Sequence, residues 1–548
     1  MGLDRDERGT YAAAYEWWAR WSGDQRGRVP PGWATVLRDD PLLRTARVVV
    51  DLVLAGGQRR ILLGPAFAHV AAGRDGIARR VHGEMASEPA LSEQVTPGEG
   101  GLARRSVSVS VSGRLVQPGA ILGTGWPIAG RGEVSLLCEG MSWDHRLVWL
   151  RGPVSGGVAF GHDDEMVDLR ISDPALTGTT IPPWVLDADR WADIDESAVG
   201  ARVPIVVGRA ILPCPRVDSA PDTFLICYGA RSYVLDSAWI NGVLDAGPIG
   251  VIEETTDGLD LPVTTIRFPS GAGNENDEIH VQVAESAANL VGLTLLEGVR
   301  RVVEDHDAGR ASARLFGEAA ARSAQFGPAS AGSVPSLVVN DACALYDWIG
   351  NDVFGDHPYL SLVWDGTQVG PVAIDHRADP VASLGPGVYP IIARAEGSRY
   401  AEQPIEDLRT GFVLRWDYNP VRDVWREATV RNPSNNTLCA MAAAVLDGPS
   451  EDRAIEALSI RDEASAGFVL DWLCEHRCRI WYETEVDAYP SAWFSLRLGD
   501  ALAWTDADVG LADAPALVLA RTWQRGIVRL GIRVYPRTWN VGGGSRSF

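Results

Sequence analysis

Strict alternation of apolar and polar residues is the feature that most constrains how this chain can fold. Residues 105–113 read RSVSVSVSG, which places Val107, Val109 and Val111 on one face of an extended segment. Further short strand-like segments lie at 47–54, 133–138, 146–151 and 166–171. Gly, Pro and Asp turns separate them, and no helical pattern lies among them. A succession of this kind predicts a small antiparallel barrel or sandwich.

The same patterns divide the whole chain into regions. The predicted regions are a Trp-rich N-terminal extension at 1–40, a β-barrel domain at 41–195, a β-rich domain at 196–310, a mixed α/β region at 311–404, a second tube-like β-barrel domain at 405–541 with a helix at 459–478, and a flexible tail at 542–548. In the second barrel, alternation predicts strands at 412–418, 479–486 and 492–498. The predicted fold class is mainly β with minor α, in which two antiparallel β-barrel domains flank a β domain and an α+β domain.

The N-terminal extension carries an aromatic cluster. Residues 11–21 read YAAAYEWWARW, a short helical pattern that places Trp17 and Trp21 on one face before two prolines end it. Two interpretations remain open, a helix that packs on its own chain and an arm that docks on a neighbour. Tryptophan is enriched at interface hot spots, so Trp17, Trp18 and Trp21 are the candidate partner-binding residues.

The charged residues exclude several functions. All 50 basic residues are arginine, so a lysine-containing phosphate-binding loop and Schiff-base chemistry are excluded. With 72 acidic residues the net charge is −22, which disfavours sequence-specific nucleic-acid binding but allows DNA to slide past. The charged start does not resemble a secretory signal, and no apolar stretch approaches the roughly 18 residues of a membrane helix. We therefore expect folding in a cytosol.

Seven scattered cysteines predict reduced, buried thiols rather than disulfides. Cys474 and Cys478 lie four residues apart on one helical face and most resemble part of a metal site. His476 would point away from that face, and no second CxxC pair completes a tetrahedron. Core packing is therefore the preferred interpretation, with no metal, no cofactor and no effect of chelators on the fold. The acidic runs at 161–165 and 304–307 are weaker metal candidates still.

Catalytic motifs are missing from the sequence. Residues 140–144 lack the second glycine of a nucleophile elbow, and no HExxH pattern occurs, so we predict no enzyme and no catalytic residues. Many of the 20 tryptophans, such as Trp143, Trp149 and Trp364, lie in or beside alternating strands, which favours core or interface packing. Two alternatives stay open: a Trp-rich carbohydrate-binding protein for host-surface attachment, and a polysaccharide hydrolase without a recognisable motif.

Several segments, in a common order, resemble the tail-hub (baseplate-hub) proteins of tailed bacteriophages and related particles. After VDLRISD at 167–173, the segment GARVPIVVGR at 200–209 is similar to the family pattern G-x-x-(I/V)-P-(I/V)-(V/I)-x-G. The segment at 234–242 is similar to the strand and hairpin that follow, and LRLGDAL at 496–502 to the hairpin L-x-x-G-D-x-(V/L). The resemblance covers roughly residues 40–540 and rests on short motifs.

The resemblance implies a structural virion protein of the tail tip, assembled in the host cytoplasm, with no catalytic residue to transfer. It implies a homotrimer in which each chain carries two related barrels, so that six barrels match a hexameric tail tube to a trimeric tip. The implied partners are the tail tube or distal tail protein, tail fibre or tip proteins, the tape-measure protein, and DNA in transit without sequence-specific binding. For such a channel we expect an acidic or neutral lining, because arginines would hold phosphates.

Overall fold

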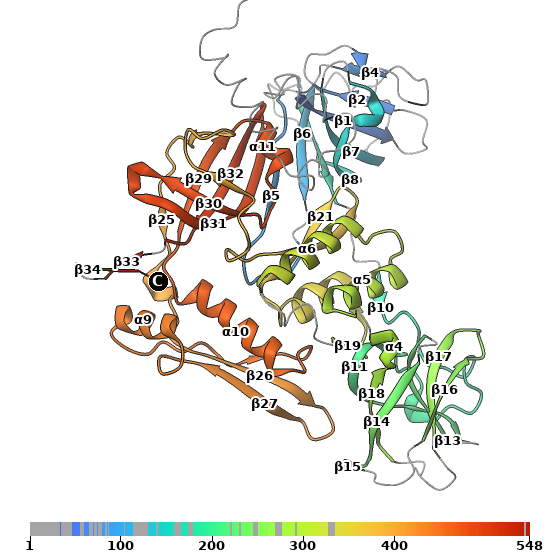
Figure 1. The fold of residues 1–548 in the computed structure, drawn as a ribbon. Coiled ribbons are helices and arrows are strands. Elements are labelled where there is room, and N and C mark those ends of the chain that lie inside the picture. The colour runs from blue at the N-terminus through green and yellow to red at the C-terminus, as the bar shows by residue number, and fades with distance from the viewer. Residues whose placement is uncertain are drawn as a thin grey trace, which may run out of the picture.

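The fold is mainly β, with several sheets and a smaller helical part (Figure 1). The computed structural model describes Trp33 and residues 46–54, 60–64, 69–70, 74, 79–82, 85, 87–102, 105–112, 130–138, 141–157, 166–173, 179–219, 222–229, 232–244, 250–268, 277–290, 293–326, 335–536, 538–541 and 544–547. The candidate residues Trp17, Trp18 and Trp21 lie outside these ranges. Among the described helices, none has the length and apolarity needed to cross a membrane.

The first sheet is built from the alternating segments of the N-terminal third. Its order is β3 (His69–Val70), β4 (Arg79–His82), β2 (Arg60–Leu63), β1 (Ala46–Leu54), β7 (Gly130–Cys138), β8 (Leu147–Gly157), β9 (Met166–Ser172) and β6 (Ser106–Ser112). Val107, Val109 and Val111 of β6 are buried, as the alternation predicts. The described strands form an open, curled half-barrel.

A second curled half-barrel comes from the C-terminal part of the chain. Its order is β23 (Ala382–Leu384), β30 (Ala501–Asp506), β31 (Leu511–Gln524), β32 (Ile527–Val534), β29 (Tyr482–Ala488) and β24 (Ile391–Arg394), with β25 (Ala401–Glu402) also on β29. Along β32, Val528, Leu530, Ile532 and Val534 are buried. The intervening arginines point to the other face, so one face of the sheet is core and the other is charged.

One strand from the N-terminal region is part of the second half-barrel. β5 (Leu91–Gln94) pairs antiparallel with residues 520–523 of β31, continuing the edge on which β30 pairs with residues 511–517. The buried side chains of both half-barrels form one continuous hydrophobic cluster. Trp33 is fully buried in it, where its Nε1 donates to the His145 carbonyl (2.6 Å) and its ring lies 4.8 Å from that of Phe494.

A β-rich region with three helices extends from the half-barrels to the opposite end of the molecule (Figure 1). One sheet has the order β15 (Val243–Leu244), β14 (Tyr233–Ile240), β18 (Ile279–Glu285), β11 (Ile205–Pro213) and β19 (Ser336–Val339). A second has the order β12 (Arg216–Ser219), β13 (Asp222–Tyr228), β17 (Pro262–Arg267) and β16 (Val251–Thr256). The helices are α4 (Ala287–Leu290), α5 (Leu295–His306) and α6 (Ala313–Phe326).

Shorter elements complete this region. They are β10 (Thr180–Ile181), β20 (Cys343–Ala344), α8 (Leu345–Asp347), the π-helix η5 (Trp348–Val353), the hairpin β21 (Leu360–Asp365) and β22 (Gln368–Ala373), and the single turn η4 (Glu196–Ala198). Three further single turns lie elsewhere: η2 (Trp143–His145) between β7 and β8, η6 (Ile405–Asp407) after β25, and η7 (Ala507–Val509) between β30 and β31. Helix α5 falls where the sequence predicted mainly strands. Its start carries a capping signal, because the Thr294 side chain accepts from the Glu297 backbone N–H (3.2 Å).

Residues 405–480 form a separate layer rather than part of the second half-barrel. The predicted strand at 412–418 is present as β26 (Phe412–Asn419), but it pairs with β27 (Val424–Arg431) and β28 (Ile455–Glu456) in a sheet of its own. Helix α10 (Glu463–Arg477), predicted at 459–478, packs on this sheet, and α9 (Thr437–Leu446) lies beside it. The chain therefore leaves the half-barrel after β25 and returns at β29.

One further prediction was wrong. The strand predicted at 492–498 is the single-turn helix α11 (Ser491–Ser495), whose five residues are all buried, so apolar periodicity could not separate helix from strand there. Near the C-terminus, β33 (Thr538–Val541) pairs antiparallel with β34 (Gly544–Ser547).

The segment that follows β5 docks closely against η5. An added Cβ at Gly100 would lie 2.1 Å from the Gly350 carbonyl oxygen and 2.6 Å from the Phe354 Cβ. The Gly100 carbonyl also accepts from the Leu362 N–H (3.2 Å). At the neighbouring Gly101, the nearest atom to an added Cβ is 4.0 Å away. Of these two positions, only Gly100 has no room for a side chain.

We expect Gly100→Ala to lower the free energy of unfolding by about 2 kcal/mol, because backbone atoms must move to admit the methyl group. Gly101→Ala is the matched control and should stay within about 0.5 kcal/mol of the parent. Urea and thermal unfolding of the two variants measure the difference. Equal stability of the two variants would contradict the close packing described here.

Candidate functional site

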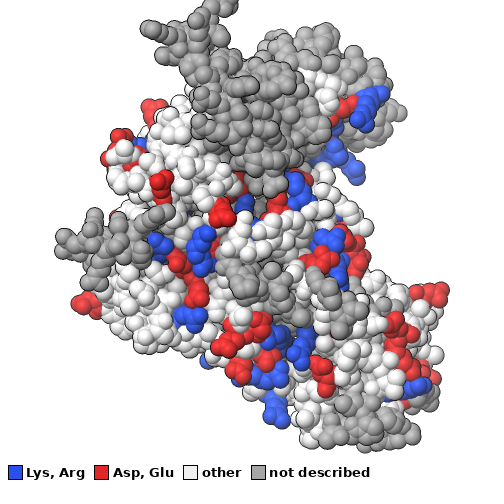
Figure 2. Space-filling view, in the orientation of Figure 1, with Lys and Arg blue, Asp and Glu red and all other residues white. Residues whose placement is uncertain are grey.

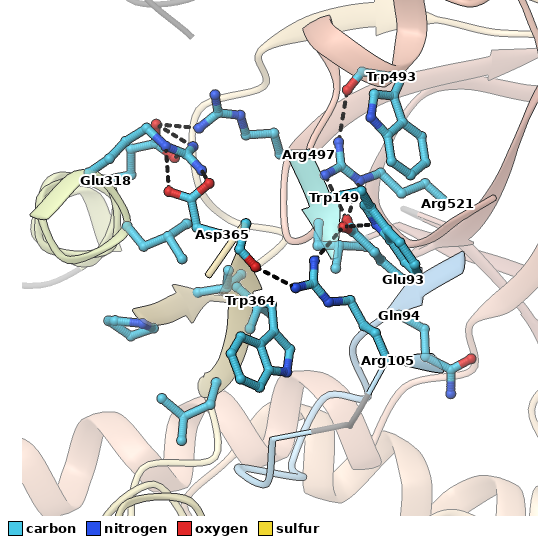
Figure 3. Close-up of a pocket in the computed structure, with 18 of the residues that line it drawn as sticks. Glu93, Gln94, Arg105, Trp149, Glu318, Trp364, Asp365, Trp493, Arg497 and Arg521 are labelled. Atoms are coloured by element: carbon cyan, nitrogen blue, oxygen red, sulfur yellow. Dashed lines mark hydrogen bonds and ion pairs between the residues drawn. The ribbon is translucent and has the colours of Figure 1, made fainter. Parts of the chain in front are cut away.

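A cavity of about 630 Å³ lies where the two half-barrels meet α6 and the β21–β22 hairpin (Figure 3). Its lining is rich in arginine, carboxylate and tryptophan. The residues labelled in Figure 3 are Glu93, Gln94, Arg105, Trp149, Glu318, Trp364, Asp365, Trp493, Arg497 and Arg521. They come from segments more than 400 residues apart in sequence, and the fold alone brings them together.

Glu93 of β5 is the central acceptor of the cavity. Its carboxylate accepts from Trp149 Nε1 of β8 (2.7 Å) and from Arg521 Nε of β31 (2.8 Å). A second guanidinium, that of Arg105, lies 3.7 Å away. One buried carboxylate therefore links the first half-barrel to the second. Charge-assisted hydrogen bonds of this kind are about twice as strong as neutral ones.

Arg105 forms the floor of the cavity. Its guanidinium donates to both oxygens of Asp173 (3.2 and 3.1 Å) and to the Gly366 carbonyl (2.7 Å). It also lies over the rings of Trp149 and Trp364, 5.0 and 5.3 Å from their centroids. Burial raises the pKa of Asp173 above its usual value, although Arg105 acts in the opposite direction. This ion pair fixes the end of β9 against the β21–β22 hairpin.

The opposite wall joins α6 to the second half-barrel. Glu318 of α6 accepts from Arg497 (2.6 Å), which precedes β30, and lies 3.4 Å from Arg314. Arg314 also pairs with Asp365 at the tip of β21 (2.6 Å). Each charged side chain that lines the cavity thus has an opposite charge within ion-pair distance. A site that binds a charged ligand keeps unpaired charges for it. Here the charges are neutralised within the chain, which is typical of an interface between domains.

We expect Glu93→Gln to destabilise the protein by about 3 kcal/mol, because the amide leaves Arg521 and Arg105 buried with a lost countercharge. Glu456→Gln is the matched control, since Glu456 forms an exposed pair with Arg415 (3.2 Å; 54% and 48% exposed side chains). That variant should change stability by less than about 0.5 kcal/mol. Thermal unfolding measures both, and similar small losses in the two variants would contradict a structural role for the cavity.

The predicted thiol pair has a companion. Cys474 and Cys478 are buried as expected, and His476 points away from them, stacked on Trp472 with its Nδ1 2.9 Å from the Tyr535 hydroxyl. The prediction that the pair lacks further ligands is wrong. A third thiol lies against both, that of Cys439 in α9, 35 residues before Cys474. No spacing motif connects it to the pair.

The other metal candidates form no such group in the described part of the chain, where only these three cysteines come together. Residues 161–165 lie outside the described ranges. Of the acidic run at 304–307, Glu304 pairs with Arg300 (2.6 Å) and Asp307 accepts from the Tyr346 hydroxyl (2.9 Å), so their carboxylates serve different neighbours.

A buried serine and histidine touch, but not as a catalytic triad. Ser459 Oγ donates to Asp356 (2.7 Å) and lies 3.1 Å from His357 Nε2. In a triad the carboxylate accepts a hydrogen bond from the histidine. Here the carboxylate of Asp356 accepts from the serine instead, and all three side chains are buried. Burial lowers the pKa of His357 to about 3, so the ring is neutral. Burial also raises the pKa of Asp356 to about 7.

The raised pKa of Asp356 predicts a pH dependence of stability. The folded state holds this proton up to about pH 7, whereas the unfolded state releases it near its usual value, 3.8. The contribution of Asp356 to stability is therefore fully present below that value and is lost as pH rises toward 7, by up to about 1.4 kcal/mol per pH unit. Asp356→Asn, which keeps the acceptor for Ser459, should remove this fall.

The measurement is the difference in unfolding free energy between parent and Asp356→Asn across pH 4.5 to 7.5. Glu456→Gln provides the control for an exposed carboxylate. Parallel pH profiles for the parent and Asp356→Asn would contradict the prediction.

No protein-family model matches the sequence, and no curated protein matches it. Solved structures similar to this chain include the tail protein from Neisseria meningitidis MC58, with 9% identity and a TM-score of 0.39 over 89% of this chain and 96% of that one. The 43 kDa tail protein of prophage MuSo2 from Shewanella oneidensis has 9% identity and a TM-score of 0.36 (89% and 98% covered). Prophage tail protein gp18 from Listeria monocytogenes EGD-e has 6% identity and a TM-score of 0.36 (88% and 94% covered).

Proposed function

We propose that this chain is a structural, non-enzymatic tail-hub subunit of a bacteriophage or related particle. The observation that carries the proposal is the presence of two curled half-barrels in one chain, packed over one shared core and linked through the side chain of Glu93 on β5. The order of sequence motifs that resembles tail-hub proteins supports it independently. In this role the protein lies at the tail tip of the virion and is assembled in the host cytoplasm.

Two half-barrels in each chain would allow a trimer to connect a sixfold-symmetric tube to a threefold-symmetric tip. Three copies of one chain supply six curled sheets around an axis, which is the number needed to continue a hexameric tube, while the rest of each chain keeps threefold symmetry. The proposed partners are the tail tube or distal tail protein on the sixfold side, and tail fibre or tip proteins on the threefold side. The tape-measure protein and DNA would pass along the axis.

The charged face of the second half-barrel fits such a channel. On β29, Glu483 and Asp487 pair with Arg533 (2.8 Å) and Arg529 (3.0 Å) of β32, and Glu485 lies 3.8 Å from Arg529. The visible surface of the molecule likewise shows acidic and basic groups side by side (Figure 2). Arginines that are held by carboxylates bind phosphate weakly, so we propose that this face lines the DNA path.

The alternatives receive less support from the described residues. A carbohydrate-binding surface needs exposed aromatic rings. Of the 15 tryptophans whose burial is described, 11 are buried and four half-buried. For a hydrolase, the nearest arrangement of serine and histidine is the buried contact between Ser459 and His357, whose carboxylate lies on the serine.

The test is the mass of the purified full-length protein under native conditions. We expect a homotrimer, three times the 59.0 kDa chain, and a ring with an axial opening in electron micrographs. A monomer at high concentration that is also monomeric in assembled particles would overturn the proposal. Binding to a glycan array by the purified protein would instead support the carbohydrate-binding alternative.

A further inference from the structure

Three buried thiols converge between two helices of the 405–480 layer. Cys439 Sγ lies 3.6 Å from Cys474 Sγ and 3.7 Å from Cys478 Sγ, and all three sulfur atoms lie within 4.8 Å of one another. None of the three residues is exposed. A disulfide requires a sulfur separation of about 2.05 Å, so these contacts are not disulfides.

The separations match thiolates around a single ion. Zinc binds sulfur at about 2.3 Å, and tetrahedral geometry then places two such sulfurs about 3.8 Å apart. The two measured separations, 3.6 and 3.7 Å, are close to that value. An iron–sulfur cluster fits less well, because its cysteines bind different irons and stand farther apart.

Few side chains of α9 are fully buried. Of its ten residues only Cys439 and Ala442 are, and Leu438 packs partly buried against the same core. A helix of this length is marginal on its own in water, and small buried side chains provide little hydrophobic stabilisation. A bond from Cys439 to α10 would strengthen this attachment.

The surroundings of Cys439 favour negative charge on its sulfur. Cys439 lies in the first turn of α9, where its backbone N–H donates to the cap Asn436 (3.1 Å) and the helix dipole favours an anion. The guanidinium of Arg431, held by Asp471 (2.7 Å), lies close enough to act electrostatically on Cys439 and Cys474. Three thiolates and one divalent ion carry a net charge of −1, and the guanidinium of Arg431 is the nearby group of opposite charge, although Asp471 shares it.

We propose that Cys439, Cys474 and Cys478 form a structural site for one thiophilic d10 ion, Zn²⁺, which fastens α9 to α10. Binding releases the thiol protons to solvent and involves no redox change. Among the described residues no fourth cysteine, histidine or carboxylate joins the group, so water or another small ligand completes the coordination. The proposal is independent of the tail-hub function and replaces the expectation that chelators leave the fold intact.

The first experiment measures metal in the full-length protein, purified under reducing conditions without chelator. We expect about one zinc per chain by elemental analysis. After chelation, titration with Co²⁺ should produce the intense near-ultraviolet thiolate-to-cobalt band, which Zn²⁺ then abolishes. Less than about 0.1 zinc per chain, together with no band on titration, would overturn the proposal. A disulfide among the three cysteines that persists in the metal-free protein under reducing conditions would overturn it as well.

The second experiment assigns the site. Cys439→Ser should weaken zinc binding about 100-fold or more, because a hydroxyl replaces one thiolate. Cys343→Ser is the control, since this half-buried thiol lies apart from the cluster and contacts the Ile181 carbonyl (3.6 Å). Unchanged affinity in Cys439→Ser would overturn the proposal.

Hydrogen exchange on the unmutated protein tests the same site without a substitution, so the test does not depend on whether a variant folds. Chelation should raise exchange in α9, leave β31 and β32 unchanged, and be reversed by Zn²⁺. Exchange in α9 that does not respond to metal would overturn the structural role.

Discussion

The pairing of β5 with β31, sealed by Glu93, is the interaction on which the rest of the structure depends. β5 lies more than 400 residues before its partner, and its carboxylate accepts from side chains of both half-barrels. Without it, residues 520–523 of β31 would present an unpaired edge, and the contact through Glu93 between the two sheets would be lost. With it, the sheets share one hydrophobic cluster, and Trp33 closes the gap between them.

Because the chain contains arginine and no lysine, guanidinium groups make the ion pairs between its domains. The planar guanidinium can engage both oxygens of a carboxylate, as Arg105 does with Asp173 and Arg431 with Asp471. Such pairs fix orientation as well as distance, which suits contacts between domains. They also neutralise many of the arginines locally in a chain whose net charge is −22.

Local patterns predicted the local elements well. The valines of β6 and the alternating residues of β32 are buried on one face, and α10 falls within its predicted range, because strand and helix periodicity are properties of neighbouring residues. Helix α5 was missed although Thr294 and Glu297 provide a capping signal. Helix α11 was predicted as a strand, because every residue in it is buried and no polar face marks its period.

The candidate sites could be predicted only in part, because they depend on long-range pairing. Cys474 and Cys478 were recognisable from their helical spacing, but Cys439 reaches them only through the packing of α9 on α10. Glu93 carries no motif at all, and its role follows from the register of β5 on β31. The course of the chain, which leaves the second half-barrel after β25 and returns at β29, also has no local signature.

Hydrogen exchange at β5 tests most directly whether the two half-barrels form one body. The Val95 N–H donates to the Leu519 carbonyl (2.8 Å), at the point where β5 meets β31. If the joint is as described, the amides of β5 and Val95 exchange only with the cooperative opening that also exposes β31 and β32. Fast exchange at β5 and Val95 while β31 and β32 stay protected would contradict the account.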